Sequence, residues 1–158
     1  TKKNALCTTN TAMPRSNRAQ VRADLVALAH AEGFEVRPLV GASSILLALM
    51  ASGANGQSFA FKGYLPADKD GRAGCLRALE QRSRQENETQ LFIETPYRND
   101  ALLADALAVL HPATRLCVAC DLTLPSQQIV SQSVAQWRKM SVLPSLKKRP
   151  ALFVLHAA

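Results

Sequence analysis

Apolar positions follow two different periods along the chain. They recur every three or four residues over 24–32, 68–88 and 99–110, which predicts amphipathic helices. Short, more continuous apolar runs lie between them and predict strands; these runs are residues 34–40, 59–63, 91–94, 115–122, 129–134 and 151–156. Residues 45–52 are apolar on every side of a helix, so we expect a buried helix there, and residues 134–140 read as a short one. Alternating strands and helices predict an α/β fold.

Length and composition agree with one packed α/β domain. The chain has 158 residues, of which 47% are hydrophobic and 20% charged, a composition unlike that of a disordered protein. Its longest apolar run, residues 45–51, is far shorter than the roughly 20 residues that span a bilayer. The four cysteines are irregularly spaced, which favours reduced thiols over a disulfide framework. We therefore expect a cytoplasmic protein with no membrane segment.

The positive charge is concentrated at the start of the chain. Residues 1–23 hold five basic residues and no acidic one, whereas residues 24–158 hold 14 basic and 12 acidic residues, so +5 of the net +7 lies in the first 23 residues. Such an arm binds phosphate non-specifically, but a solvated arm is the simpler interpretation. We expect residues 1–22 to be a disordered or aberrant segment.

Three short motifs place glycine, proline and hydroxyl residues at the ends of apolar runs. They are Pro-Leu-Val-Gly-Ala-Ser-Ser at 38–44, Phe-Lys-Gly-Tyr-Leu-Pro at 61–66 and Ile-Glu-Thr-Pro-Tyr-Arg at 93–98. In open α/β sheets, ligands bind outside the carboxyl ends of strands. The three motifs together predict a ligand site there.

The first and third motifs each have a structural alternative. Gly41 permits close approach of a ligand, and Ser43 and Ser44 offer hydroxyls at a helix start, but the residues alone favour a plain helix cap for the serines over ligand binding. In the third motif, Glu94 and its neighbours either face a ligand or form a helix start with Thr95 as the cap.

A metal site is not expected. Cys117 and Cys120 form a single C-x-x-C, and residues three apart on a strand point to opposite faces. Zinc needs four ligands, and the three histidines are widely separated with no helical metal spacing. The two cysteines are better interpreted as core thiols.

In their order, the three motifs resemble the carboxyl-terminal half of the tetrapyrrole methylase-like family of S-adenosylmethionine-dependent methyltransferases. The nearest branch methylates a ribose 2′-hydroxyl of small-subunit ribosomal RNA. The resemblance runs from about Asp24 to the end of the chain. It implies a mixed sheet flanked by helices, the second domain of the family fold, with the first domain largely missing. Residues 23–40 would then be a remnant of that first domain, and residues 41–158 the methyltransferase domain.

The resemblance also implies which residues serve the site. S-adenosylmethionine is the expected cofactor, and the expected cofactor-binding residues are Gly41, Ser43, Ser44, Glu94, Thr95, Leu122 and Ala151. Lys69, Arg72 and Arg98 fall where substrate contacts are expected, although the first two also suit the solvated start of a helix. Ribosomal RNA or the small subunit is the expected partner, and the family implies a homodimer.

The chain departs from the family at several positions. Residues 11–20 lack the acidic, glycine-rich stretch that forms part of the cofactor pocket, so the chain is either a fragment or a gene model that begins in the wrong place. In the third motif Tyr97 replaces the family's histidine, and Cys120 and Asp121 replace an arginine and a glutamate. The sequence names no catalytic base.

We therefore expect a methyltransferase acting on a ribose hydroxyl of ribosomal RNA. Two alternatives remain: a non-catalytic remnant or accessory module that binds RNA or a partner, and a family member that acts on a small tetrapyrrole-like substrate. A T-P-x-G-N segment encoded upstream would favour the enzyme.

Overall fold

The computed structural model describes residues 15–157, with side chains described from Ala23 onward. The chain divides into two compact units, one ending at Gly41 and the other comprising Ala42–Ala158. The first unit consists mainly of helix α1 (Arg15–Ala31) and an extended segment that follows it.

Two expectations for the first unit are wrong. Helix α1 begins at Arg15, so residues 15–22 are helical rather than irregular; residues 1–14 lie outside the described residues. The helix ends at Ala31, and Gly33 follows in the turn after it, with a φ of 72° that suits a glycine after a helix. Residues 34–40 do not form a strand, because only Glu35 makes an isolated bridge. An apolar run becomes a strand only when a neighbouring strand takes its hydrogen bonds.

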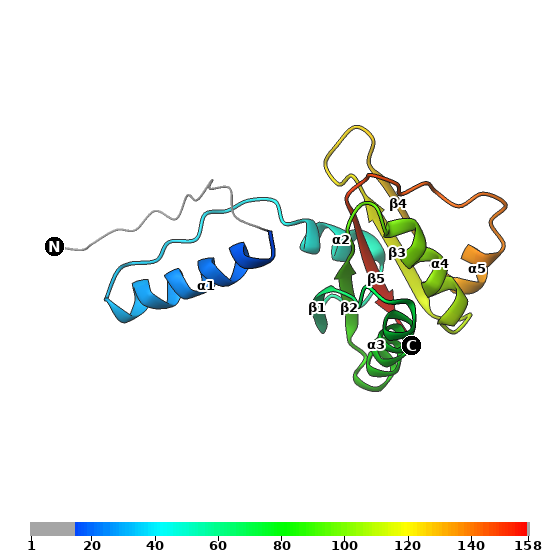
Figure 1. Cartoon of the computed structure of the whole chain (residues 1–158), viewed down its shortest axis with the longest axis horizontal. Helices are drawn as coiled ribbons and strands as arrows, with labels where there is room; N and C mark the ends of the chain where they lie inside the picture. Colours follow the sequence, from blue (N-terminus) through cyan, green and yellow to red (C-terminus); the bar gives the residue numbers. More distant parts are fainter. Residues whose placement is uncertain (1–14, 158) are drawn as a thin grey trace. The chain divides into compact units, whose positions relative to one another are not determined.

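The second unit is built on a five-stranded mixed sheet (Figure 1). Along the chain its elements are α2 (Ser44–Ser52), β1 (Phe59–Tyr64), α3 (Lys69–Glu86), β2 (Thr89–Ile93), α4 (Asn99–Val109), β3 (Arg115–Cys120), β4 (Gln128–Ser133), α5 (Val134–Arg138) and β5 (Ala151–His156). The strand order is β1-β2-β5-β3-β4, with β1 and β2 parallel and every other neighbouring pair antiparallel. The predicted mixed α/β sheet is confirmed.

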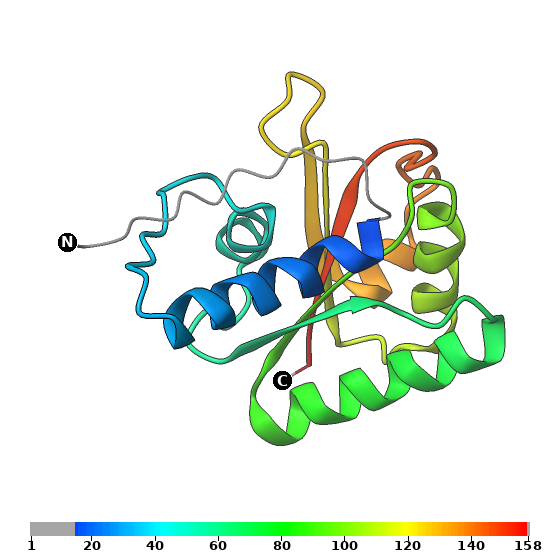
Figure 2. The ribbon, with the colours of Figure 1, turned by 60° about the vertical axis from the view of Figure 1, so that its left-hand side comes forward.

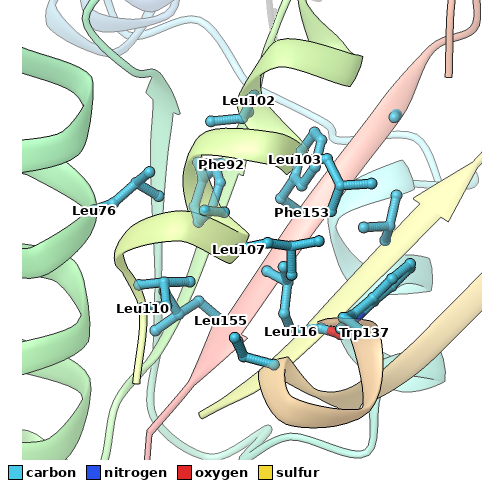
Figure 3. Packing of buried hydrophobic residues seen from close by; sticks show 14 of the residues in the cluster. Leu76, Phe92, Leu102, Leu103, Leu107, Leu110, Leu116, Trp137, Phe153 and Leu155 are labelled. Carbon is cyan, nitrogen blue, oxygen red and sulfur yellow. The ribbon is translucent and has the colours of Figure 1, made fainter. Parts of the chain in front are cut away.

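One face of the sheet carries the larger core, under α3, α4 and α5 (Figure 3). Phe92 and Phe153 lie on neighbouring strands there, with their rings stacked at a centroid distance of 5.6 Å. Trp137 of α5 is fully buried and donates its indole N–H to the Leu116 carbonyl at 2.8 Å. The sequence predicted α3 and α4 from their inward leucines, such as Leu76 in α3 and Leu102 in α4, and that prediction is confirmed.

The other face is covered by α2 alone among the described elements of this unit (Figure 2). Ala48 and Leu49 pack onto β3 and β5, but Leu46 and Met50 remain 49% and 80% exposed. The expectation of a fully buried helix is therefore wrong. A single nine-residue helix lying against one layer buries one side only.

The register of the sheet brings five strand ends together. Strands β1, β2 and β3 end where β4 and β5 begin, because Tyr64 pairs with Ile93 and Cys120 pairs with both Ala151 and Gln128. We call this edge the carboxyl rim. It is the edge at which ligands bind in open α/β sheets.

Candidate functional site

Most of the predicted cofactor residues lie at the carboxyl rim. Glu94 and Thr95 directly follow β2, Leu122 follows β3 by two residues, and Ala151 is the first residue of β5. Helix α2 begins with Ser44, and its Leu47 lines a hollow together with Leu122, which follows β3. Gly41 belongs to the first unit and is not placed relative to the others.

The start of α2 leaves its serine hydroxyls available. Ser43 occupies the position before the helix in an extended conformation (φ −114°, ψ 119°), yet its side chain makes no capping hydrogen bond. Ser44 is exposed. The plain helix-cap interpretation is therefore wrong for these serines, and the first amides of α2 remain open to an acceptor on a ligand.

Glu94 is the most tightly held residue of the third motif. Its side chain is completely buried, and its Oε1 accepts from the Thr95 amide at 2.6 Å and from Arg98 Nε and Nη2 at 3.1 and 2.8 Å. Helix α4 starts only at Asn99, so Thr95 does not cap it, and that alternative is wrong. The motif instead forms a turn, closed by the Arg98 amide bonding the Thr95 carbonyl.

Two buried acceptors at this rim lack a donor. Among the described residues, neither Glu94 Oε2 nor Asn99 Oδ1 has a hydrogen-bond partner. Asn99 uses its Nδ2 to donate to the Arg149 carbonyl at 2.7 Å, which ties the start of α4 to the chain just before β5. Unsatisfied buried acceptors are uncommon in folded proteins and mark places where a water or a ligand donor belongs.

The loop between β3 and β4, at the top of Figure 1, has an unusual backbone. Asp121 and Thr123 have positive φ values of 51° and 70°. Such values cost energy in residues other than glycine, particularly a β-branched one, and they concentrate at functional sites. The two strained residues flank Leu122, whose backbone the family resemblance places beside the cofactor.

Arg149 holds this loop in place. Its guanidinium donates to Asp121 Oδ2 at 2.8 Å, to the Ser126 carbonyl at 2.8 Å and to Gln128 Oε1 at 3.2 Å. The hydrogen bond from Arg149 is the main cause that lowers the pKa of Asp121, with a second contribution from Ser126. No sequence pattern pointed to Arg149 or Asn99, because the partners named here lie 21 to 50 positions away along the chain.

An apolar hollow of about 300 Å³ lies between α2 and this loop. Leu47 and Met50 line it from α2, Ile129 from β4, and Leu122 and Thr123 from the loop. Hydroxyls and strained backbone beside an apolar hollow suit a small molecule with an apolar ring and polar substituents. In the described part of the unit, this arrangement offers binding groups but no obvious general base.

The three predicted substrate residues have different environments. Lys69 is exposed at the start of α3, and Arg98 is partly exposed beside Glu94. Arg72, however, is 6% exposed and donates to Asp105 Oδ2 through Nε at 2.7 Å and to the Ala67 carbonyl at 2.8 Å. Its guanidinium is thus occupied inside the protein, which corrects the expectation that it meets phosphate.

The thiols behave as core residues. Cys117 packs on the α2 face and Cys120 on the opposite face, as their spacing predicts. Burial raises the pKa of Cys117 to about 11.

Within residues 15–157, no group of three or more potential ligands is placed to hold a metal ion. None of the helices in this range is both long and apolar enough to cross a bilayer.

Comparison with known proteins relates the chain to bacterial methyltransferases. It is 32% identical over 133 residues to ribosomal RNA small subunit methyltransferase I of Pseudomonas aeruginosa, covering 84% of this chain and 46% of that protein. The protein of the same name from Neisseria meningitidis is 35% identical over 104 residues, covering 66% and 34%. The chain thus spans less than half the length of these relatives, and no protein-family model matches it.

Solved structures share the fold. The methyltransferase CobJ superimposes with a TM-score of 0.53 at 17% identity, over 89% of this chain and 59% of that one. A conserved protein of Aeropyrum pernix gives a TM-score of 0.54 at 15% identity, over 89% and 54%. At these identities the likeness concerns the fold alone.

Proposed function

The chain belongs to the tetrapyrrole methylase-like family of methyltransferases, and from this premise we propose that it is part of an S-adenosylmethionine-dependent enzyme that methylates a ribose 2′-hydroxyl of small-subunit ribosomal RNA. The observation that carries the proposal is the carboxyl rim. There the open start of α2, the strained loop after β3 and the orphaned acceptor of Glu94 surround one edge of the sheet.

The residues at the rim fit the cofactor chemically. The hollow beside Leu122 and Met50 suits its adenine ring, while the hydroxyls of Ser43 and Ser44 and the amides of α2 suit its carboxylate. Glu94 Oε2 is an acceptor awaiting a donor, as the cofactor's hydroxyl or ammonium groups would provide. We propose these residues, with Gly41, Thr95 and Ala151, as the part of the pocket that this chain supplies.

Methyl transfer of this kind depends mainly on aligning the methyl donor with the attacking oxygen. S-adenosylmethionine supplies an activated methyl group on a sulfonium, and transfer proceeds in line with the attacking oxygen. The chain's own residues would orient the donor and exclude water, contributions that account for much of the rate in such reactions. Arg149 would act indirectly, by holding the strained loop that contacts the ligand.

We further propose that the protein acts in the cytoplasm as a homodimer. Support for self-association comes from β1, an edge strand on which Phe59 and Phe61 are 40% and 42% exposed. Exposed aromatic side chains on a sheet edge are typical of an interface. Light scattering on the purified chain at several concentrations would measure its oligomeric state.

The test joins this chain to the part of the Pseudomonas aeruginosa relative that the similarity does not cover, since this chain spans 46% of that protein. The chimera should transfer a labelled methyl group from S-adenosylmethionine to small-subunit ribosomal RNA. Ser43→Ala and Glu94→Gln should each weaken cofactor binding, whereas Ser141→Ala, at an exposed position outside the rim, should not. A folded chimera that neither binds the cofactor nor methylates the RNA would refute the proposal.

A further inference from the structure

Two exposed tyrosines lie at the carboxyl rim outside the proposed cofactor pocket. Tyr97, at the turn after β2, is 76% exposed, and Tyr64, at the end of β1, is 54% exposed. Tyr64 pairs with Ile93, so both rings stand at the ends of neighbouring strands. Exposed rings of this size have no role in the core.

Lysines lie directly beside Tyr97. The Lys148 amide donates to the Pro96 carbonyl at 3.0 Å, which brings the 146–149 segment against the turn that carries Tyr97. Lys148 adopts a positive φ of 62°, and both Lys147 and Lys148 are exposed. Among the described residues, neither lysine forms an ion pair within 4.0 Å.

Arg98 completes the surface in a fixed orientation. Among the described residues, two of its five N–H donors find an acceptor, and both bond the buried carboxylate of Glu94. Its side chain remains 40% exposed, so the other donors are accessible. The nearby acids are engaged: Glu94 with Arg98, Asp121 with Arg149, and Asp100 with the Leu146 amide at 2.8 Å.

We propose that this tyrosine–lysine surface, formed by Tyr64, Tyr97, Arg98, Lys147 and Lys148, binds single-stranded RNA. The inference rests on the proposed function and names the surface that would receive its substrate. Aromatic rings stack on unpaired bases, and cations spaced along a groove follow the phosphates. Paired bases are stacked inside a duplex and leave no free face for a tyrosine, so the rings favour a single strand.

The experiment uses the chain alone and needs no cofactor. An end-labelled single-stranded RNA oligonucleotide of mixed sequence is titrated by fluorescence anisotropy at several salt concentrations. A duplex RNA of the same length and an acidic peptide serve as competitors. We expect the single strand to bind and the other two to compete poorly.

Substitutions of the tyrosine and of the lysines distinguish the contribution of base stacking from that of charge. Tyr97→Ala should weaken binding by about 5- to 150-fold, since one stacked base is worth roughly 1–3 kcal/mol, while Tyr97→Phe keeps the affinity. Lys147→Ala/Lys148→Ala should reduce the salt slope by about 1.4, at roughly 0.7 per phosphate contact. The matched control is Arg77→Ala/Arg84→Ala on α3, which removes the same charge from exposed positions outside the rim.

The outcomes distinguish this surface from the proposed function. An equal change of slope in the α3 control would assign binding to net charge and overturn the proposal, as would no binding by the unaltered chain. Preference for duplex or peptide would also overturn it. Methylation by the chimera with an unchanged response to Tyr97→Ala would leave the enzyme intact and refute the surface alone.

Discussion

Arg72 and Lys69 lie three positions apart at the start of α3, but the fold uses them differently. Lys69 faces solvent, whereas Arg72 is held by Asp105 with side-chain exposures of 8% and 14%. The sequence showed two equivalent cations, because the partner of Arg72 lies 33 positions away on α4. Only the packing of α3 against α4 distinguishes them.

We predict that Arg72→Ala lowers the free energy of unfolding by about 3 kcal/mol, since it leaves a carboxylate unpaired. The double variant Arg72→Met/Asp105→Leu should recover most of this loss, because it removes both charges. Urea denaturation measures the stabilities. Fluorescence anisotropy should show that the double variant keeps the salt dependence of RNA binding. A smaller slope of affinity against salt concentration in this variant would mean that Arg72 contacts the RNA after all.

The ionisation of Asp121 makes the stability of the carboxyl rim depend on pH in the acidic range. Its pKa lies below the ordinary 3.8 because Arg149 and Ser126 hydrogen-bond the charged form. The unfolded chain therefore binds a proton before the folded chain does. The stabilisation is complete above the ordinary pKa and is lost as the pH falls through the lower pKa of the folded state.

Hydrogen exchange between about pH 5 and pH 2, corrected for intrinsic rates, should show residues 121–128 losing protection as Asp121 protonates. In Asp121→Asn that acid-induced step should disappear, because the amide does not titrate in this range. Persistence of the same step in the asparagine variant would assign it to another group.

Helix α2 presents two leucines in opposite environments at matched positions. Leu49 is 6% exposed and packs on the sheet, whereas Leu46 is 49% exposed. We predict that Leu49→Ala costs about 2–4 kcal/mol of unfolding free energy and Leu46→Ala about 1 kcal/mol or less. Chemical denaturation of both variants checks the difference. Equal losses of unfolding free energy would mean that the Leu46 side chain is buried against another surface in solution.

The sequence predicted a helix or strand correctly where its hydrophobic period was clear and its hydrogen-bond partners lay nearby in the chain. Residues 99–110 predicted α4 because every inward leucine recurs at helical spacing. Residues 34–40 alternate as a strand would but lack a ladder partner, which periodicity does not reveal. The burial of α2 was also not predictable from its hydrophobic pattern. The sequence shows that this helix is apolar, but the fraction of its surface that is buried depends on how many layers pack around it.

The molecule as a whole spans less than half of its ribosomal RNA methyltransferase relatives. The proposed function implies a cofactor held between two domains, and each tenfold in affinity corresponds to about 1.4 kcal/mol. A polypeptide that supplies the contacts of only one domain should therefore bind several factors of ten more weakly.

We predict that the 158-residue polypeptide binds S-adenosylmethionine weakly or not at all, although its rim is formed. Titration calorimetry on this chain and on the chimera measures both affinities under the same conditions. Micromolar binding by the short chain would show that these 158 residues hold the cofactor without a second domain, and the two-domain account would then be abandoned.

Among the described strands, β5 comes last along the chain and lies at the centre of the sheet, between β2 and β3. During synthesis on the ribosome, the other four strands of this sheet emerge before the one that joins the two halves. Until residues 151–156 are released, β2 and β3 each expose an unpaired apolar edge, the kind of surface that recruits other chains into aggregates. A nonsense codon just before Ala151 would thus leave two half-sheets with exposed edges, which chaperones and proteases would act on.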